Sequence, residues 1–199
     1  MRRALLAVLV VLVLAGCQTG PETAGSAPAE TSVDVDTPAL RALKQRVGVE
    51  PCEPGRSRGE LPEVTLACLG GGPGVDMSRL RGPLVINLFA QWCGPCRAEM
   101  PYYQQLHVKA RGAVKVLGID YLDTRPSLAL DLVQRTGVTY PLLADPAGVL
   151  RPHFRIRGLP GVVLVDADGE VADVEFRVVR SYAELRNLVQ RELDVRVPR

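Results

Sequence analysis

Two cysteines that are separated by two residues, Cys93 and Cys96, have the spacing that most clearly indicates chemistry in this chain. The apolar run over residues 84–90 predicts a buried strand before them, and the segment after them predicts a helix. A Cys-x-x-Cys pair between a strand and the first turn of a helix is typical of a redox-active dithiol. Cys93 would take the N-cap position, where free backbone N–H groups and the positive end of the helix dipole favour a thiolate. Cys96, one turn further on, would be less exposed and would resolve a mixed disulfide.

The alternative for this pair is half of a zinc site. A structural zinc site needs four ligands, but the chain has no second Cys-x-x-Cys and only two histidines, His107 and His153. We therefore expect no metal at the pair, and no organic cofactor, because the redox equivalent is the disulfide itself. The sequence pattern predicts His107 on the polar face of a helix and His153 in a turn, both without a catalytic role.

The N-terminal segment predicts export and membrane attachment. Residues 1–16 combine two arginines with an apolar stretch that is too short to span a bilayer comfortably, as in a secretory signal. The sequence Leu-Ala-Gly-Cys that ends at Cys17 resembles the bacterial lipobox, which implies cleavage before Cys17 and attachment of lipid, including palmitate, to that residue. An ordinary signal peptide or an uncleaved signal anchor is the alternative. Residues 17–37 are small and polar and predict a flexible tether, so we expect a lipid-anchored protein on the extracytoplasmic face of a bacterial cell membrane.

The charge balance gives no indication of nucleic-acid binding. Removal of residues 1–16 would take away Arg2 and Arg3 and no acidic residue, which leaves 22 basic residues against 22 acidic ones. No basic stripe stands out in the sequence. The 199 residues are enough for one domain and a tail, and we expect a monomer.

The apolar pattern predicts an α/β fold with a central mixed sheet and helices on both faces. We expect an N-terminal helix and loop over residues 38–60 and the main domain over residues 61–199. Strands are predicted at 64–68, 83–90, 114–120, 138–143, 161–166 and 170–178, and helices at 97–111, at 124–137 and from 181 onward, where Ser181 and Glu184 form a capping box.

Several motifs in this order resemble the thioredoxin superfamily, and within it the membrane-anchored TlpA/ResA/DsbE-like branch. The motifs are Arg81-Gly82-Pro83, Trp92–Cys96, Cys96–Pro101 and Arg157–Pro160. The resemblance covers about residues 61–193 and implies a thioredoxin-like fold and a thiol–disulfide oxidoreductase. It implies substrates among cysteine-containing exported proteins. These would be apocytochrome c, which needs a reductant during cytochrome c maturation, or newly exported chains, which need an oxidant. A membrane thiol–disulfide electron donor would be a further partner.

The resemblance also implies roles for residues around the dithiol. Pro160 matches the cis-proline of the family, and the backbone before it, at Leu159, would pair with the substrate chain like an added strand. Trp92, Gly94 and Pro95 would complete the substrate-binding surface. Gly161 departs from the threonine that is common in the family at this position. A trans proline that starts an edge strand is the alternative for Pro160.

The resemblance implies that Glu99, three residues after Cys96, handles protons for the dithiol. Cytoplasmic thioredoxins use an aspartate six residues before the first cysteine, where this chain has Asn87. Asn87 cannot titrate, which agrees with a transfer of this role to Glu99. A carboxylate in such a partly apolar site would have a raised pKa. A solvated surface glutamate is the alternative, and Glu184, in the last helix, is predicted to be remote from the chemistry.

Cys52 and Cys68 remain once Cys17, Cys93 and Cys96 are assigned. In an oxidising compartment we expect them to form a structural disulfide. The alternative is a second redox pair that relays electrons to Cys93. We rank it lower because no helix start precedes either cysteine.

Two further functions are weaker alternatives. A copper-handling module on this fold would use Cys93, Cys96 and His153, and thiolates suit Cu(I). A proline packed against the sulfurs would obstruct a metal there. A peroxidase is weaker still, because no lone cysteine has a Pro-x-x-x-Thr-x-x-Cys context.

Overall fold

The computed structural model describes residues 33–110 and 112–199. The predicted signal over residues 1–16, the lipid-bearing Cys17 and most of the tether lie outside the described residues. Within the ranges that are described, no helix has both the length and the apolar character needed to cross a membrane.

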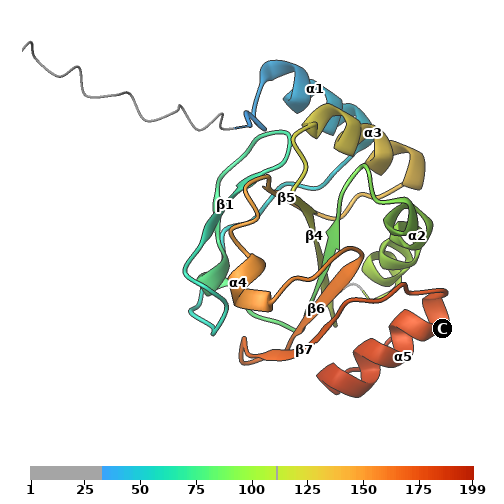
Figure 1. The fold of residues 1–199 in the computed structure, drawn as a ribbon. Helices are drawn as coiled ribbons and strands as arrows, with labels where there is room; N and C mark the ends of the chain where they lie inside the picture. Colours follow the sequence, from blue (N-terminus) through green and yellow to red (C-terminus); the bar gives the residue numbers. More distant parts are fainter. Residues whose placement is uncertain (1–32, 111) are drawn as a thin grey trace, which may run out of the picture. The chain divides into compact units, whose positions relative to one another are not determined.

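Seven strands form one mixed sheet in the order β2-β1-β5-β4-β3-β6-β7 (Figure 1). The strands are β1 (Thr65–Cys68), β2 (Val75–Asp76), β3 (Leu84–Phe89), β4 (Lys115–Tyr121), β5 (Leu142–Asp145), β6 (Gly161–Val165) and β7 (Val171–Glu175). β3 runs parallel to β4 and antiparallel to β6, and β4 runs parallel to β5. The outer pairs β1–β2, β1–β5 and β6–β7 are antiparallel.

The six residues of β3 are all buried because both faces of the sheet are covered. Val85 and Phe89 point into one core, whereas Ile86 and Leu88 point into the other, as the period of two along a strand requires. This double burial explains why the segment is continuously apolar rather than alternating.

The helices divide unequally between the two faces. They are α1 (Pro38–Val47), α2 (Gly94–Lys109), α3 (Pro126–Thr136), α4 (Arg151–Phe154) and α5 (Tyr182–Leu193), with a short 3₁₀ helix at Met77–Arg79. Buried residues of α1, α2, α3 and α5 belong to the first core, and Phe154 of α4 belongs to the second. Figure 1 shows the four longer helices on one side of the sheet and α4 on the other. The predicted mixed sheet with helices on both faces is therefore confirmed.

The helix ends follow the sequence signals. The Thr37 side chain accepts a hydrogen bond from Leu40 N at 3.2 Å, and Gly48 ends α1 with a φ of 80°. Gly137 ends α3 in the same left-handed region, with a φ of 70°, where glycine has no Cβ penalty. Ser181 caps α5 by accepting a hydrogen bond from Glu184 N at 3.1 Å.

One predicted strand is displaced along the sequence. The pattern predicted a strand over 138–143, but β5 begins at Leu142. Val138 N donates to Val133 O at the end of α3, and Thr139 N donates to the Gln104 side chain on α2. Pro141 has no N–H to donate. These backbone donors are therefore used by the helices, and pairing with β4 starts only after the proline.

His107 differs from its prediction. It is only 9% exposed rather than on a polar face. Its Nε2 atom lies 3.0 Å from Glu50 Oε1, and its ring contacts the Tyr140 ring edge-on. The loop after α1 covers this side of α2, which a helical periodicity cannot reveal.

Candidate functional site

Cys93 and Cys96 form a disulfide at the N-terminus of α2. Cys93 is the N-cap residue, with extended backbone, and its Sγ accepts a hydrogen bond from Cys96 N at 3.2 Å. The same N–H would stabilise a Cys93 thiolate after reduction, together with the positive end of the helix dipole. The first turn of α2 contains no acidic residue that would oppose this effect.

The two sulfur-bearing residues differ in exposure. Cys93 is 4% exposed and Cys96 is completely buried. Both residues are therefore buried, and Cys93 is the one that keeps some contact with solvent. The prediction that Cys96 is less exposed than Cys93 is confirmed, and the roles of the two sulfurs in exchange stay a prediction.

An exposed rim surrounds Cys93. The Trp92 side chain is 54% exposed, and its Nε1 atom donates to Leu122 O at 3.3 Å. Gly94 and Pro95 are exposed on the first turn of α2. A large exposed aromatic beside a reactive sulfur offers a contact surface for a second chain.

The segment before β6 lies at the same edge of the sheet. Leu88 pairs with Gly161, so Pro160 lies level with the end of β3, which leads into the dithiol motif. The Leu159–Pro160 bond is cis, as is Gly82–Pro83, which the sequence analysis did not identify as cis. Leu159 is half-buried and packs against both cores, and Cys93 belongs to the first of them.

Gly161 lies in a tightly packed position at the start of β6. A Cβ at this position would lie 3.0 Å from the Phe176 ring and 3.2 Å from a methyl group of Leu88. The glycine therefore allows Phe176 to pack closely at the start of β6.

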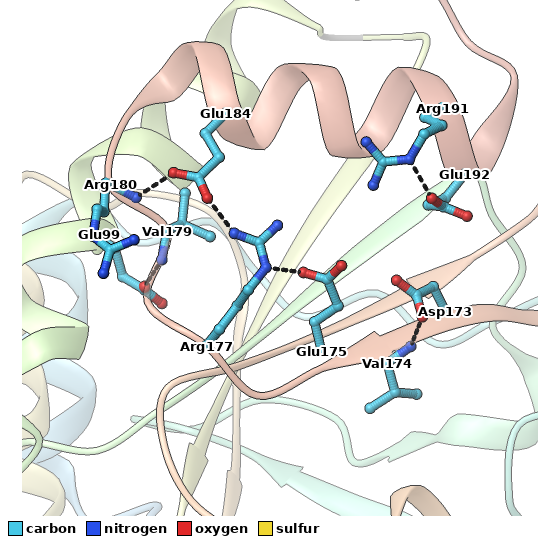
Figure 2. A network of polar contacts seen from close by, with 10 residues as sticks. All are labelled: Glu99, Asp173, Val174, Glu175, Arg177, Val179, Arg180, Glu184, Arg191 and Glu192. Carbon is cyan, nitrogen blue, oxygen red and sulfur yellow. Dashed lines mark hydrogen bonds and ion pairs between the residues drawn. The ribbon is translucent and has the colours of Figure 1, made fainter.

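Glu99 is completely buried on α2, which excludes the solvated surface glutamate. Its Oε2 atom accepts a hydrogen bond from Val179 N at 2.9 Å, and Oε1 has no partner among the described residues (Figure 2). Burial raises the pKa of the Glu99 carboxyl to about 7, although the hydrogen bond from Val179 opposes this rise. Glu99 can therefore hold or release a proton near neutral pH.

Glu184 is closer to Glu99 than the sequence suggested. Its carboxylate accepts from Arg180 N at 2.9 Å and pairs with Arg177 (Figure 2). The charge of Glu184 raises the pKa of Glu99, and the charge of Arg177 lowers it. The prediction that Glu184 is remote is wrong, because the segment before α5 contacts Glu99 through Val179.

Asn87 occupies the middle of β3 and is completely buried. Its Nδ2 atom donates to the Tyr140 hydroxyl at 3.0 Å, and its Oδ1 atom has no partner among the described residues. Burial also raises the pKa of Tyr140, so neither side chain carries charge at neutral pH. Glu99 can therefore titrate near neutral pH, whereas Asn87 cannot.

Two acids near the dithiol were missed by the sequence analysis. Asp120, the residue before the last of β4, lies opposite Phe89 and is 1% exposed. Asp123 accepts hydrogen bonds from Gln91 N at 2.8 Å and from Arg125 N at 2.9 Å. Burial raises the pKa of Asp120 well above its usual range, and the charge of Asp123 acts in the same direction. Through its hydrogen bond from Gln91 N, Asp123 holds the backbone that leads into Trp92 and Cys93.

A sequence signal for these acids did exist. The carboxyl ends of adjacent parallel strands meet at one edge of a sheet, so acids that end β4 must lie near the motif that follows β3.

The other cysteine pair lies apart from this site. Cys52 and Cys68 are disulfide-bonded and belong to the second core, whereas Cys93 and Cys96 belong to the first. Cys68 is the last residue of β1. In the sheet, β5 and β4 lie between β1 and β3, the strand that leads to Cys93.

His153 is exposed on α4. In the part of the chain that is described, no three His, Cys, Asp or Glu side chains gather in a way that could hold a metal ion. The arrangement gives no support to the copper-handling alternative.

Comparison with known proteins identifies similar chains. Residues 58–174 match the AhpC/TSA family. The chain is 29% identical to the thiol-disulfide oxidoreductase ResA of Oceanobacillus iheyensis over 50% of its length, and 34% identical to the thiol:disulfide interchange protein DsbE of Vibrio cholerae over 56%. It spans 53% of the ResA chain and 60% of the DsbE chain, so it matches little more than half of these curated relatives.

The structure resembles that of MTB dsbF, which was solved in mixed oxidized and reduced forms. The TM-score is 0.59 at 27% identity, and the match covers 66% of this chain and 98% of the other. The predicted thioredoxin-like fold is confirmed.

Proposed function

Because this chain belongs to the AhpC/TSA family and carries a disulfide at the start of a helix, we propose that it is a thiol–disulfide oxidoreductase of the ResA and DsbE type. The observation that supports this most strongly is the position of Cys93 as the N-cap of α2, with Cys96 N directed at its sulfur. The names of the curated relatives agree with this activity.

The exchange would take place in two balanced steps. A substrate thiolate attacks Cys93 Sγ, the Cys93–Cys96 bond breaks, and its electron pair leaves on Cys96. A second substrate thiolate then attacks the substrate sulfur of this mixed disulfide, which releases Cys93 as a thiolate and leaves an oxidised substrate. The reverse sequence, which begins with the Cys93 thiolate attacking a substrate disulfide, reduces the substrate.

Glu99 would supply or accept the proton in these steps. The leaving Cys96 thiolate needs a proton, and a carboxylic acid with a pKa of about 7 can donate one at neutral pH. Burial of Glu99 keeps this proton exchange inside the first core, away from bulk water.

The substrates we propose are cysteine-containing exported proteins. Apocytochrome c would require the reducing direction, and newly exported chains would require the oxidising direction. The rim formed by Trp92, Gly94, Pro95 and Leu159 would contact the substrate chain. We also propose lipid attachment at Cys17 on the extracytoplasmic face of the membrane, with a membrane thiol–disulfide donor as a partner.

Trapping of mixed disulfides tests the proposed chemistry. In Cys96→Ser, Cys93 can form a mixed disulfide that is not resolved, so substrate adducts should accumulate at Cys93. The matched control, Cys93→Ser, should form almost none. Equal trapping by both variants would refute the assignment of Cys93 as the nucleophile.

A separate measurement tests the anchor. Intact mass spectrometry of the wild-type protein from a bacterial membrane should show lipid on Cys17, and Cys17→Ala should lack this lipid. Wild-type protein without lipid would contradict the lipobox interpretation.

A further inference from the structure

Lys44 on α1 has an unusual environment next to the Cys52–Cys68 disulfide. The residue is only 7% exposed, and its Nζ atom lies 2.9 Å from Cys68 Sγ and 2.9 Å from Gly71 O. A disulfide sulfur is only a weak acceptor. The ammonium is therefore held against a group that gives little compensation for its lost hydration.

No carboxylate in the described part of the chain forms an ion pair with Lys44. Asp36 is the acid whose charge acts on it, and Asp36 is itself paired with Arg41 at 2.6 Å. Burial accordingly lowers the pKa of Lys44. A negative charge that formed on Cys68 would be the nearest counterion for this ammonium.

The lysine stem is also held in place. A Cβ at Gly70 would lie 2.9 Å from Lys44 Cβ, so the turn after β1 packs directly on the start of this side chain. The contact between Lys44 and Cys68 is therefore built into the packing of α1 on the end of β1.

A cavity lies against the other cysteine of the pair, Cys52, which is 3% exposed. It has a volume of about 710 Å³, and Cys52 lines it whereas Cys68 does not. Val75, Leu84 and Leu117 contribute apolar walls. The side chains that line it include four cations, two carboxylates and one histidine: Arg56, Arg79, Arg81, Lys115, Glu50, Glu53 and His107. The excess of cations would attract an anionic thiolate.

We propose that Cys52–Cys68 is a second thiol-exchange site, at which a thiolate from an external dithiol attacks Cys52 through this cavity and Lys44 stabilises the departing Cys68 thiolate. The thiolate forms a bond to Cys52 Sγ, the Cys52–Cys68 bond breaks, and the electron pair leaves on Cys68 beside the ammonium. The second thiolate of the dithiol then attacks its partner sulfur in this mixed disulfide. Cys52 leaves as a thiolate that takes a proton from water, the dithiol becomes a disulfide, and two electrons have entered the protein.

In this scheme Lys44 affects both the rate and the equilibrium of the reduction of Cys52–Cys68. Exchange is faster when the leaving thiol is more acidic, and an oppositely charged neighbour makes it more acidic. Stabilisation of the reduced form also makes the pair easier to reduce. A structural disulfide needs neither feature, and the proposal does not depend on the chemistry of Cys93 and Cys96.

The test uses the full chain with Cys93→Ser and Cys96→Ser as the parent, so that the pair at α2 cannot contribute. Dithiothreitol and reduced thioredoxin serve as probes for a small and a protein-borne dithiol, and peptide mapping after alkylation reports Cys52 and Cys68. We expect Lys44→Met to slow the reduction of Cys52–Cys68 by about tenfold or more. The equilibrium constant for this reduction in a glutathione buffer should fall by a similar factor, which corresponds to a shift of about 30 mV in the reduction potential. Arg46→Met, which removes an exposed cation from the same helix, should leave both unchanged.

The position of the adduct is an independent readout. In a glutathione buffer the mixed disulfide of the parent should form on Cys52. Lys44→Arg, which keeps the charge, should stay within about threefold of the parent rate. Reduction by one probe alone identifies the source of the dithiol and supports the site. Reduction by neither probe, equal rates for Lys44→Met and its parent, or an adduct mainly on Cys68 would overturn the proposal.

Discussion

The two disulfides of this protein lie in different cores and have different surroundings. Cys93–Cys96 closes the first turn of α2, where the backbone N–H of Cys96 donates to the Cys93 sulfur. Cys52–Cys68 joins the loop after α1 to the end of β1, where the buried ammonium of Lys44 contacts Cys68. A thiolate can be stabilised by a helix terminus or by a single cation, and this chain places one arrangement at each pair. If Cys52–Cys68 exchanges as proposed, the absence of a helix start does not by itself identify a disulfide as inert.

The largest expected difference between the two pairs is in catalysis. Cys93→Ser should reduce disulfide exchange with substrate proteins to the background of the assay, because the attacked sulfur at the exposed rim is lost. The double variant Cys52→Ala/Cys68→Ala should keep the alkylation rate of Cys93, since β5 and β4 separate β1 from β3. Insulin reduction and thiol alkylation would measure both effects. If Cys52→Ala/Cys68→Ala lost disulfide exchange while Cys93→Ser kept it, the catalytic role would belong to Cys52–Cys68 instead.

The double variant Cys52→Ala/Cys68→Ala should show its main effect on stability. The two cysteines are 16 residues apart in the sequence, and closing a loop of this length stabilises a protein by about 3 kcal/mol in the chain-entropy model. Urea unfolding followed by the fluorescence of Trp92 would measure the loss. Cys93→Ser/Cys96→Ser, which opens a much shorter loop, is the matched control and should lose less.

Glu99→Gln should remove a pH dependence of the stability of the folded protein, which arises from this buried carboxyl in the first core. Between pH 4.5 and about 7 Glu99 is protonated in the folded protein and ionised in the unfolded chain, so stability falls as pH rises through this window. The variant should therefore gain stability relative to wild type, by about 3 kcal/mol between pH 4 and pH 8. Urea unfolding of the oxidised proteins, in which the thiols do not titrate, would measure this gain.

Glu192→Gln is the control for this prediction, because Glu192 lies on α5 and pairs with Arg191. It should follow the pH profile of wild type. In the reduced protein, Glu99→Gln should also change how the alkylation rate of Cys93 depends on pH. If wild type and Glu99→Gln had the same pH profiles of stability and of Cys93 alkylation, Glu99 would have no role in the protonation of the dithiol.

The smallest expected effect concerns the backbone before the dithiol. Asp123→Ala removes the acceptor for Gln91 N and Arg125 N. Loss of such partly buried hydrogen bonds to a charged group should cost about 2 kcal/mol of stability. Asp131→Ala, on α3 and half-buried, is the control and should change stability by less than about 0.5 kcal/mol. Equal losses in a thermal unfolding experiment would show that Asp123 has no special structural role.

The sequence predicted the parts of the site that depend on local patterns. The strand before Cys93, the helix after it and the β6–β7 hairpin all follow from apolar periodicity and turn residues, and the structure contains them. The start of β5 was misplaced because tertiary hydrogen bonds to Val133 and Gln104 hold the backbone of residues 138 and 139.

Contacts between distant segments could not be predicted in the same way. Val179 N reaches Glu99 across 80 positions, and Lys44 reaches Cys68 across 24. No local sequence motif around Glu99 or Lys44 predicts which distant residue it contacts. The burial of His107 under the loop that carries Glu50 is a third case, since a helix pattern reports which face is apolar but not which loop covers it.

The reduction potential of Cys93–Cys96 tests the central claim most directly. The full chain would be equilibrated in glutathione and dithiothreitol buffers, alkylated, and mapped at the peptide that contains both cysteines. We predict a value between about −270 mV, as in reducing thioredoxin, and about −120 mV, as in DsbA. The position within this interval would decide the direction of electron transfer. A value below about −300 mV, typical of structural disulfides, would contradict a redox function for this pair.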